Sequence, residues 1–169
     1  LGAVVGHGLA AVSDTYVPVE NDDYATYVAQ FPDAVGSLEV SRVAAGYPNN
    51  LNFEVFCENG AASFSQETPS QVRLFLHDDQ PGRNGYRTVD LGSDHPYVAG
   101  GMAIDVSGVG FGQNEGFAYQ ARAFLEEVAG IDEAESLPRN ATFDEGVHNM
   151  EILAAVAQSA ANNGKTVTL

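Results

Sequence analysis

The stretch LNFEVFCENGAASFSQ at positions 51–66 decides the fold class of this chain. Two short runs rich in apolar and aromatic side chains, at 51–57 and 61–66, flank the tripeptide Glu-Asn-Gly. The step from Asn59 to Gly60 tolerates the positive φ that a tight hairpin turn demands. The stretch therefore predicts two antiparallel strands joined by a short turn.

Similar strand-like runs lie on both sides of this hairpin. Gly, Pro or Asn interrupt them about every 8 to 12 residues, a spacing typical of an antiparallel sheet and not of alternating βαβ units. The further runs cover residues 4–17, 24–31, 37–45, 71–76 and 86–91. Together the runs predict an open, mostly antiparallel sheet of about six strands.

The last third of the chain changes to a helical pattern. A first helix is predicted between Asn114, a suitable N-cap, and Gly130, which would stop it. Its apolar residues repeat with a period near 3.6, which predicts one buried stripe. The stripe comprises Phe117, Ala121, Phe124, Leu125 and Val128.

A second helix is predicted to begin with a capping box that starts at Thr142 and to end before Gly164. Residues 165–169 then read as an edge strand. The small side chains of this helix predict close packing on the sheet. Its expected buried stripe comprises Val147, Met150, Ala154, Ala157 and Ala161.

Strands first and helices later predict a single α+β domain over residues 1–169, with the helices packed on one face of the sheet. The predicted elements leave no segment to cover the other face. We therefore expect that face to be an interface with another copy of the chain, in a homo-oligomer such as a dimer.

The charge balance excludes several classes of partner. The chain has 169 residues, of which 7 are Lys or Arg and 23 are Asp or Glu, so its formal net charge is −16. Such a surface repels phosphate, so we expect no nucleic-acid partner and no binding to anionic membranes. The sequence contains no run of 18 apolar residues and no recognisable leader, and its lone cysteine suits a reducing compartment, so we expect a cytoplasmic location.

Three short motifs resemble ligand sites but have simpler explanations. The stretch at 6–11 fits a dinucleotide fingerprint, yet no βαβ unit follows it, which favours a glycine-bearing strand. Glu145 and His148 form one Glu-x-x-His pair where di-iron sites need two. His77 beside two aspartates is explained by a polar hairpin tip. We therefore predict no catalytic, cofactor-binding or metal-binding residue in this chain.

Three other residues stand out by their local setting. His95 precedes a proline in the connection between sheet and helix, where functional side chains are often exposed. Arg42 lies in a strand-forming segment of an acidic chain, so we expect it to pair with a carboxylate of the protein or of a ligand. Cys57 alternates with Phe53 and Val55, which predicts a buried thiol.

The order of several short motifs resembles the C-terminal domain of the Gfo/Idh/MocA oxidoreductases. The matching pieces are SRVAAG at 41–46, NLNFEVF at 50–56, HPY at 95–97, FDEG at 143–146 and GKTV at 164–167. This resemblance covers almost the whole chain. It implies a parent enzyme whose N-terminal Rossmann domain, absent here, holds NAD or NADP.

The resemblance also implies a function for this half of the parent. It would bind a sugar or polyol substrate, form the oligomer and be inactive by itself, with no measurable binding of NAD(P). By position in the pattern, the side chains expected to line the sugar are Arg42, Tyr47, Asn49, Asn50 and His95. Amide and phenol groups suit sugar hydroxyls, which both donate and accept hydrogen bonds.

Two alternatives stay open at the level of sequence. One is a freestanding acidic α+β binding or scaffold module that self-associates through its sheet. The other is a secreted carbohydrate-binding β-domain, which the two long helices and the absence of tryptophan disfavour. A reading frame that continues upstream through a Rossmann fingerprint would distinguish the oxidoreductase from the scaffold.

Overall fold

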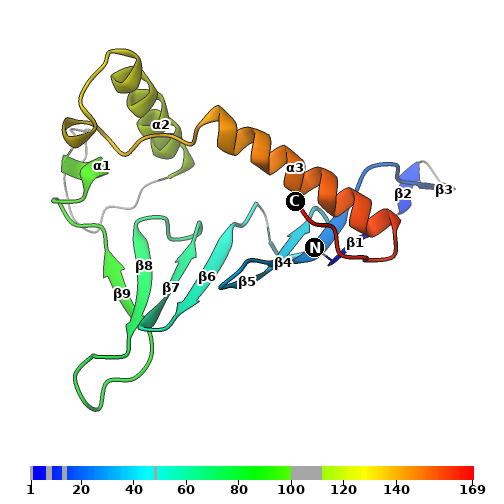
Figure 1. Ribbon diagram of the computed structural model, residues 1–169, viewed down its shortest axis with the longest axis horizontal. Helices are drawn as coiled ribbons and strands as arrows, with labels where there is room; N and C mark the ends of the chain where they lie inside the picture. The colour runs from blue at the N-terminus through cyan, green and yellow to red at the C-terminus, as the bar shows by residue number, and fades with distance from the viewer. Residues whose placement is uncertain (1, 7–8, 13–14, 48, 100–111) are drawn as a thin grey trace. The chain divides into compact units, whose positions relative to one another are not determined.

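The computed structural model describes residues 2–6, 9–12, 15–47, 49–99 and 112–169 (Figure 1). The chain forms two compact units. The first unit joins Leu1–Tyr47 to Ala141–Leu169, and the second is Pro48–Asn140. No helix in the described ranges is long and apolar enough to cross a membrane.

The sheets of the first unit are antiparallel. Strands β1 (Gly2–Gly6), β4 (Tyr24–Gln30) and β5 (Val35–Ser41) form one sheet in the order β1-β4-β5. Strands β2 (Leu9–Val12) and β3 (Thr15–Pro18) form a separate pair. The fingerprint-like stretch at 6–11 therefore enters strands and opens no helix in its described part, as predicted, while His7 and Gly8 lie outside the described residues.

Helix α3 (Phe143–Ala161) packs against β1 of the same unit. Its predicted capping box is confirmed, because the hydroxyl of Thr142 accepts from the N–H of Glu145 and the carboxylate of Glu145 accepts from the N–H of Thr142 at 2.7 Å. The predicted buried stripe is wrong. Val147 and Met150 are exposed, and the helix buries Ala155, Val156 and Ser159 instead.

The C-terminal segment leaves α3 in a turn, and residues 165–169 do not form the predicted edge strand. Gly164 has a φ of +76°, which favours glycine, and its N–H donates to the carbonyl of Ser159 at 2.8 Å. The fully buried hydroxyl of Ser159 donates to the carbonyl of Lys165 at 2.7 Å. The carbonyl of Lys165, the first residue of the predicted strand, is therefore bonded to α3 and is not paired with a neighbouring strand.

The second unit contains a four-stranded antiparallel sheet in the order β6-β7-β8-β9. The predicted α+β class with antiparallel strands is confirmed, although the nine strands of the described residues form three sheets and not one of about six. The run at 4–17 divides into three short strands. The strands of the second unit are β6 (Asn52–Cys57), β7 (Gly60–Ser65), β8 (Gln71–Leu76) and β9 (Arg87–Asp90).

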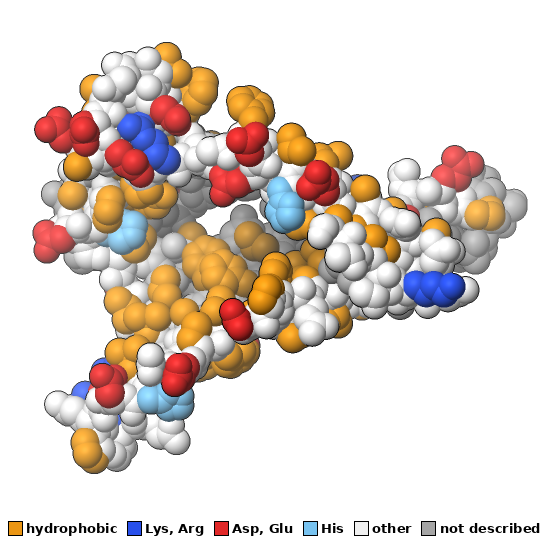
Figure 2. All heavy atoms as spheres, viewed as in Figure 1, with side chains coloured by type: hydrophobic (Ala, Val, Ile, Leu, Met, Phe, Trp, Pro, Cys, Tyr) orange, Lys and Arg blue, Asp and Glu red, His pale blue; other side chains and the backbone are white. Residues whose placement is uncertain are grey.

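Strand register gives this sheet one strongly apolar face, and hydrophobic side chains gather in its region in Figure 2. Because side chains alternate across a strand, the residues paired through the ladder share that face. The apolar sheet face comprises Phe53, Val55, Cys57, Ala62, Phe64, Val72, Leu74, Leu76 and Val89, together with Gly60 and, at its β9 edge, Arg87, which pairs with Asp79. Cys57 is exposed, so the prediction of a buried thiol is wrong. The alternating sequence pattern correctly assigned Cys57 to the apolar face, but it does not show whether other residues cover that face.

The helical elements of the second unit follow the sheet. They are α1 (Pro96–Ala99), α2 (Gln113–Val128) and the short 3-10 helix η1 (Glu133–Glu135). Helix α2 begins two residues earlier than predicted, with Gly112 and not Asn114 at the N-cap, and Gly130 follows it with a φ of +72°. The predicted stripe of α2 is also wrong, because Phe117, Phe124 and Val128 are exposed. The buried residues are Tyr119 and Ala123.

The hairpin of β6 and β7 is confirmed, but Gly60 is required for a different reason from the one predicted. The turn residues are Glu58 and Asn59, and no residue of this turn has a positive φ. Gly60 is the first residue of β7 and pairs with Leu76 of β8. A Cβ atom at Gly60 would overlap the backbone carbonyl oxygen of Phe75.

We predict that Gly60→Ala destabilises the fold by about 1–3 kcal/mol, the usual cost of overpacking, because the neighbour is backbone and cannot rotate away. Urea unfolding followed by circular dichroism measures the loss. Gly92→Ala is the matched control in the same unit, since a Cβ there meets nothing within 4 Å. Equal stabilities of the two variants would contradict the steric explanation.

Candidate functional site

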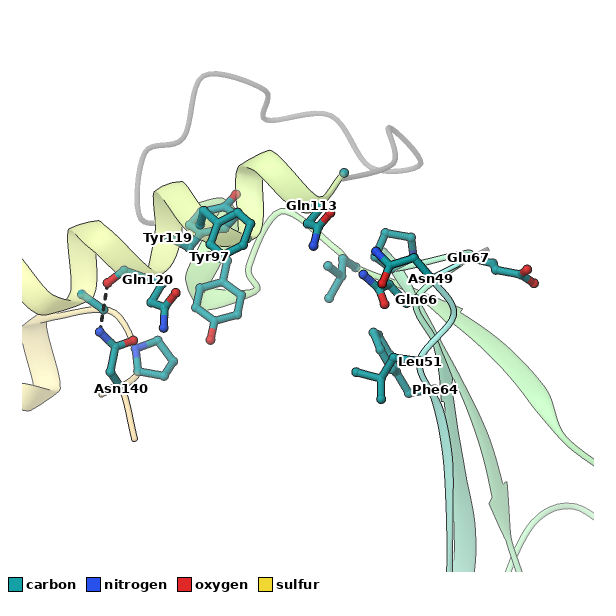
Figure 3. Close-up of a pocket in the computed structure, with 17 residues that line it drawn as sticks. Asn49, Leu51, Phe64, Gln66, Glu67, Tyr97, Gln113, Tyr119, Gln120 and Asn140 are labelled. Atoms are coloured by element: carbon teal, nitrogen blue, oxygen red, sulfur yellow. Dashed lines mark hydrogen bonds between the residues drawn. The ribbon is translucent and has the colours of Figure 1, made fainter. Parts of the chain in front are cut away.

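The second unit contains a cavity of about 960 Å³ (Figure 3). Residues at the ends of β6 and β7 line one side, and α1, α2 and the segment after η1 line the other. The polar lining side chains are the carboxamides of Asn49, Gln66, Gln113, Gln120 and Asn140, the carboxylate of Glu67 and the tyrosines Tyr97 and Tyr119. Apolar lining is supplied by Leu51, Phe64, Leu91, Phe117 and Ala123.

A small aromatic core holds α1 against α2 beside the cavity. The rings of Tyr97 and Tyr119 lie 4.9 Å apart between centroids, and Tyr119 packs with Ala123 and Leu137. Burial, with the nearby carboxylate of Glu115, raises the pKa of Tyr119, so its phenol stays protonated at neutral pH. Figure 3 shows the hydroxyl of Tyr97 directed into the cavity.

A partly buried carboxylate contact positions the segment that follows η1. The Oε2 atom of Glu126 accepts from the backbone N–H of Leu137 at 2.8 Å, and its Oε1 atom accepts from Nε of Arg122 at 2.8 Å. These hydrogen bonds lower the pKa of Glu126, the bond from Leu137 contributing most. Further along, the amide of Asn140 donates to the carbonyl of Gln120 at 2.9 Å (Figure 3). Both bonds tie this wall of the cavity to α2.

The beginning of α2 lies at the opposite end of the cavity lining. Gly112 and Gln113 line the cavity there. The N–H of Gly112 donates to the carboxylate of Glu115 at 2.9 Å, so a side chain of the helix itself occupies its N-terminus. Glu145 caps α3 in the same way. Each of these helices therefore begins beside a carboxylate, whose negative charge disfavours the pyrophosphate of a dinucleotide there.

Asn49 is the one predicted sugar-lining residue that the structure places in the cavity wall. Its φ of +49° is left-handed, a conformation that asparagine tolerates better than most residues. His95 does not line the cavity, but its ring lies 5.3 Å from that of Tyr97, which does. Asn50 also lies outside the lining, and its amide atoms are buried without a hydrogen-bond partner in the described part of the chain.

The other two predicted residues, Arg42 and Tyr47, belong to the first unit and are exposed. The backbone N–H of Arg42 donates to the carbonyl of Asp23 at 2.8 Å. No ion pair of its side chain is found among the described residues, so its pairing with a ligand carboxylate stays a prediction. Substrate contact by any of the five predicted residues likewise stays a prediction.

Sequence reasoning missed most of the polar lining. Gln66 follows a strand, Gln113 and Gln120 lie on a helix, and Asn140 lies in a loop. Isolated carboxamides in such positions are usually solvated surface groups, so no local sequence pattern identifies them as residues of a binding site. Asn49 was the exception, whereas Tyr97 stood in the HPY motif without being singled out itself.

The motifs weighed as metal sites have other neighbours in the structure. The ring of His77 packs edge-on to Phe75 at 5.0 Å, and Nδ1 of His148 lies 3.4 Å from the carboxylate of Glu151. Over the described ranges, no group of three His, Cys, Asp or Glu residues could hold a metal ion.

No protein-family model matches the chain, but individual proteins do. Levoglucosan dehydrogenase of Pseudarthrobacter phenanthrenivorans is 34% identical over 113 residues, which are 66% of this chain and 28% of that protein. A solved structure of levoglucosan dehydrogenase in complex with NADH and L-sorbose has a TM-score of 0.76 at 28% identity, over 96% of this chain and 43% of the other.

The resemblance to the Gfo/Idh/MocA oxidoreductases is confirmed. An oxidoreductase domain protein from Kribbella flavida adds a TM-score of 0.74 at 27% identity, over 87% of this chain and 38% of the other. This chain therefore spans less than half of the length of these Gfo/Idh/MocA-like relatives.

The contact of Glu126 with Leu137 predicts a pH dependence of stability. Because the pKa of Glu126 is lowered in the folded chain, its stabilising effect is present above the unfolded carboxyl pKa of about 4.3 and is lost as the pH falls through the lower folded value. We expect Glu126→Gln to lower the free energy of unfolding at neutral pH and to flatten its fall in acid.

Urea unfolding at a series of pH values measures this effect, with Glu127→Gln as the control at the neighbouring exposed position. The control is expected to keep the acid dependence of the parent chain. An unchanged acid dependence in Glu126→Gln would contradict the assigned role of the bond.

Proposed function

We propose that this chain is the substrate-binding and oligomer-forming part of an NAD- or NADP-dependent oxidoreductase that acts on a hydroxyl of a sugar or polyol. We assign it the C-terminal position in that enzyme and a cytoplasmic location. The observation that carries the proposal is the carboxamide- and phenol-lined cavity of the second unit, in a chain similar to levoglucosan dehydrogenase.

The lining groups match the chemistry of a sugar. A carboxamide supplies both a donor and an acceptor, as each hydroxyl requires, and the phenol of Tyr97, whose hydroxyl is directed into the cavity in Figure 3, can donate as well. Leu51 and Phe64 offer apolar surface against which the C–H groups of a ring can pack. These groups would hold and orient the substrate.

The chemical step is assigned to the part of the parent enzyme that this chain does not contain. A nicotinamide supplies hydride transfer when it is held against the substrate. Both long helices of this chain carry a carboxylate at their N-termini, which does not suit the pyrophosphate of that cofactor. We therefore propose that the chain is inactive alone and does not bind NAD(P) measurably.

Self-association is the second part of the proposal, and the apolar sheet face supports it. On this face Phe53, Val55 and Val89 are about half exposed, at 52%, 47% and 47%. Contiguous exposed apolar surface of this kind marks interaction sites. The same face also supports the alternative function, a freestanding scaffold that self-associates, and an upstream reading frame with a Rossmann fingerprint would decide against that alternative.

We predict that levoglucosan and L-sorbose bind in the cavity and that NADH, used as the negative control, does not bind. Titrations followed by ¹H–¹⁵N NMR should shift the side-chain amides of Gln66, Gln113 and Gln120. Asn49→Gly removes one carboxamide yet permits the left-handed φ, so it should weaken sugar binding roughly threefold to tenfold without loss of stability.

Asn84→Gly is the matched control, since Asn84 is exposed in a loop of the same unit and does not line the cavity. Sugar-induced shifts outside the cavity lining, or equal affinity in the two variants, would contradict this placement of the site. Micromolar binding of NADH would contradict the division of roles.

We predict that Val89→Lys weakens self-association at least roughly tenfold, because a lysine on the apolar sheet face must lose water when a second copy covers it. Thr88→Lys is the control, because it places the same charge on the next residue of β9 but on the opposite face. Sedimentation equilibrium compares the two variants with the parent chain. A strictly monomeric parent chain at high concentration would contradict the proposed interface.

A further inference from the structure

The cavity of the second unit has an unusual balance of charge for a ligand site. Among the lining residues that the structure describes, no side chain is Lys, Arg or His. Its one carboxylate, on Glu67, points away from the other lining groups in Figure 3. The described part of the lining is therefore polar but carries no cation.

The basic residues nearest in sequence to the lining are Arg122, Arg139 and His95, and none of them lines the cavity. Nε of Arg122 pairs with the carboxylate of Glu126 at 2.8 Å, and Nη2 of Arg139 donates to the carbonyl of Ile131 at 2.7 Å. The ring of His95 lies tilted against that of Tyr97, and its Nδ1 accepts from the backbone N–H of Tyr97 at 3.4 Å.

A helix N-terminus is the usual substitute for a cation at an anion site, and here a carboxylate already lies beside it. The carboxylate of Glu115 accepts the N–H of Gly112 at 2.9 Å at the start of α2, where Gly112 and Gln113 line the cavity. A phosphate or carboxylate entering at this end would meet another negative charge, within a chain whose net charge is −16.

The rest of the lining favours an uncharged ligand that has hydroxyl groups and some apolar surface. The carboxamides of Asn49, Gln66 and Gln113 come from three separate segments and lie together in Figure 3, with Leu51 and Phe64 beside them. Neutral carboxamides bind hydroxyls well, but they do not offset the cost of removing an anion from water.

Resting on the proposed sugar-binding function, we propose that this cavity binds uncharged sugars and polyols and discriminates against their phosphorylated and carboxylated counterparts. Discrimination follows from the absence of a cation in the described lining and from the capping of α2 by Glu115. The substrate of the parent enzyme would then be unphosphorylated at the part of the molecule that this cavity holds.

The test compares glucose with glucose 6-phosphate as a matched pair of ligands, using ¹H–¹⁵N NMR titration of the full chain. We expect glucose to shift the side-chain amides of the cavity and glucose 6-phosphate to bind at least roughly tenfold more weakly. Gluconate serves as the carboxylated member of the series, with the same expectation.

Two arginine variants test the cause of the discrimination. Gln113→Arg places a cation in the lining and should strengthen binding of glucose 6-phosphate about tenfold, because charge-assisted bonds to phosphate are strong. Asn114→Arg is the matched control, since it adds the same charge at the next residue of α2, which is exposed and outside the lining.

The outcomes separate the two proposals. If glucose 6-phosphate binds as tightly as glucose in the parent chain, or if Asn114→Arg strengthens it as much as Gln113→Arg does, the discrimination is refuted while the sugar site stands. If no sugar shifts the cavity amides up to the solubility limit, both the discrimination and the proposed sugar site are refuted. The inference is supported if the parent chain binds glucose 6-phosphate weakly and only Gln113→Arg strengthens that binding.

Discussion

Apolar side chains stabilise a fold only when other atoms cover them, and in this chain the covering surface is scarce. Among the described residues, the buried apolar side chains form small groups, with Tyr119, Ala123 and Leu137 in one unit and Ala155 and Val156 in the other. Backbone ladders, helix caps and single carboxylate contacts therefore position much of the structure. The bond from Leu137 to Glu126 is an example, because it holds a wall of the cavity without a large core behind it.

The sequence predicted best those features that a few neighbouring residues decide. The capping box at Thr142 and the hairpin at 51–66 depend on hydrogen bonds and turns within short segments. Gly130 follows α2 in a left-handed conformation for the same local reason. Such contacts form whatever lies elsewhere in the molecule, so reading the sequence locally is enough to place them.

Prediction was wrong where a distant partner decides the outcome. A 3.6-residue period identifies the apolar side of a helix, but it does not identify what covers that side. Met150 of α3 and Phe124 of α2 lie on such stripes and are exposed, and Cys57 is exposed on the apolar sheet face for the same reason. The same limit applies to the cavity, whose polar wall combines side chains that are distant in sequence and individually ordinary. Only Asn49 was singled out beforehand among its carboxamides.

The glutamate that caps α2 affects both the stability of the helix and the charge of the ligand that the cavity would accept. A glutamate in the first turn stabilises a helix, because it satisfies an otherwise unpaired N–H and complements the helix dipole. In an acidic chain with few basic side chains, the N-terminus of a helix is the main remaining place where an anion could be held. Glu115 at α2 and Glu145 at α3 occupy both of the long described helices in this way. The caps that help these helices begin where they do therefore also place a negative charge where a phosphate would otherwise be attracted, which is the physical basis of the proposed selection by ligand charge.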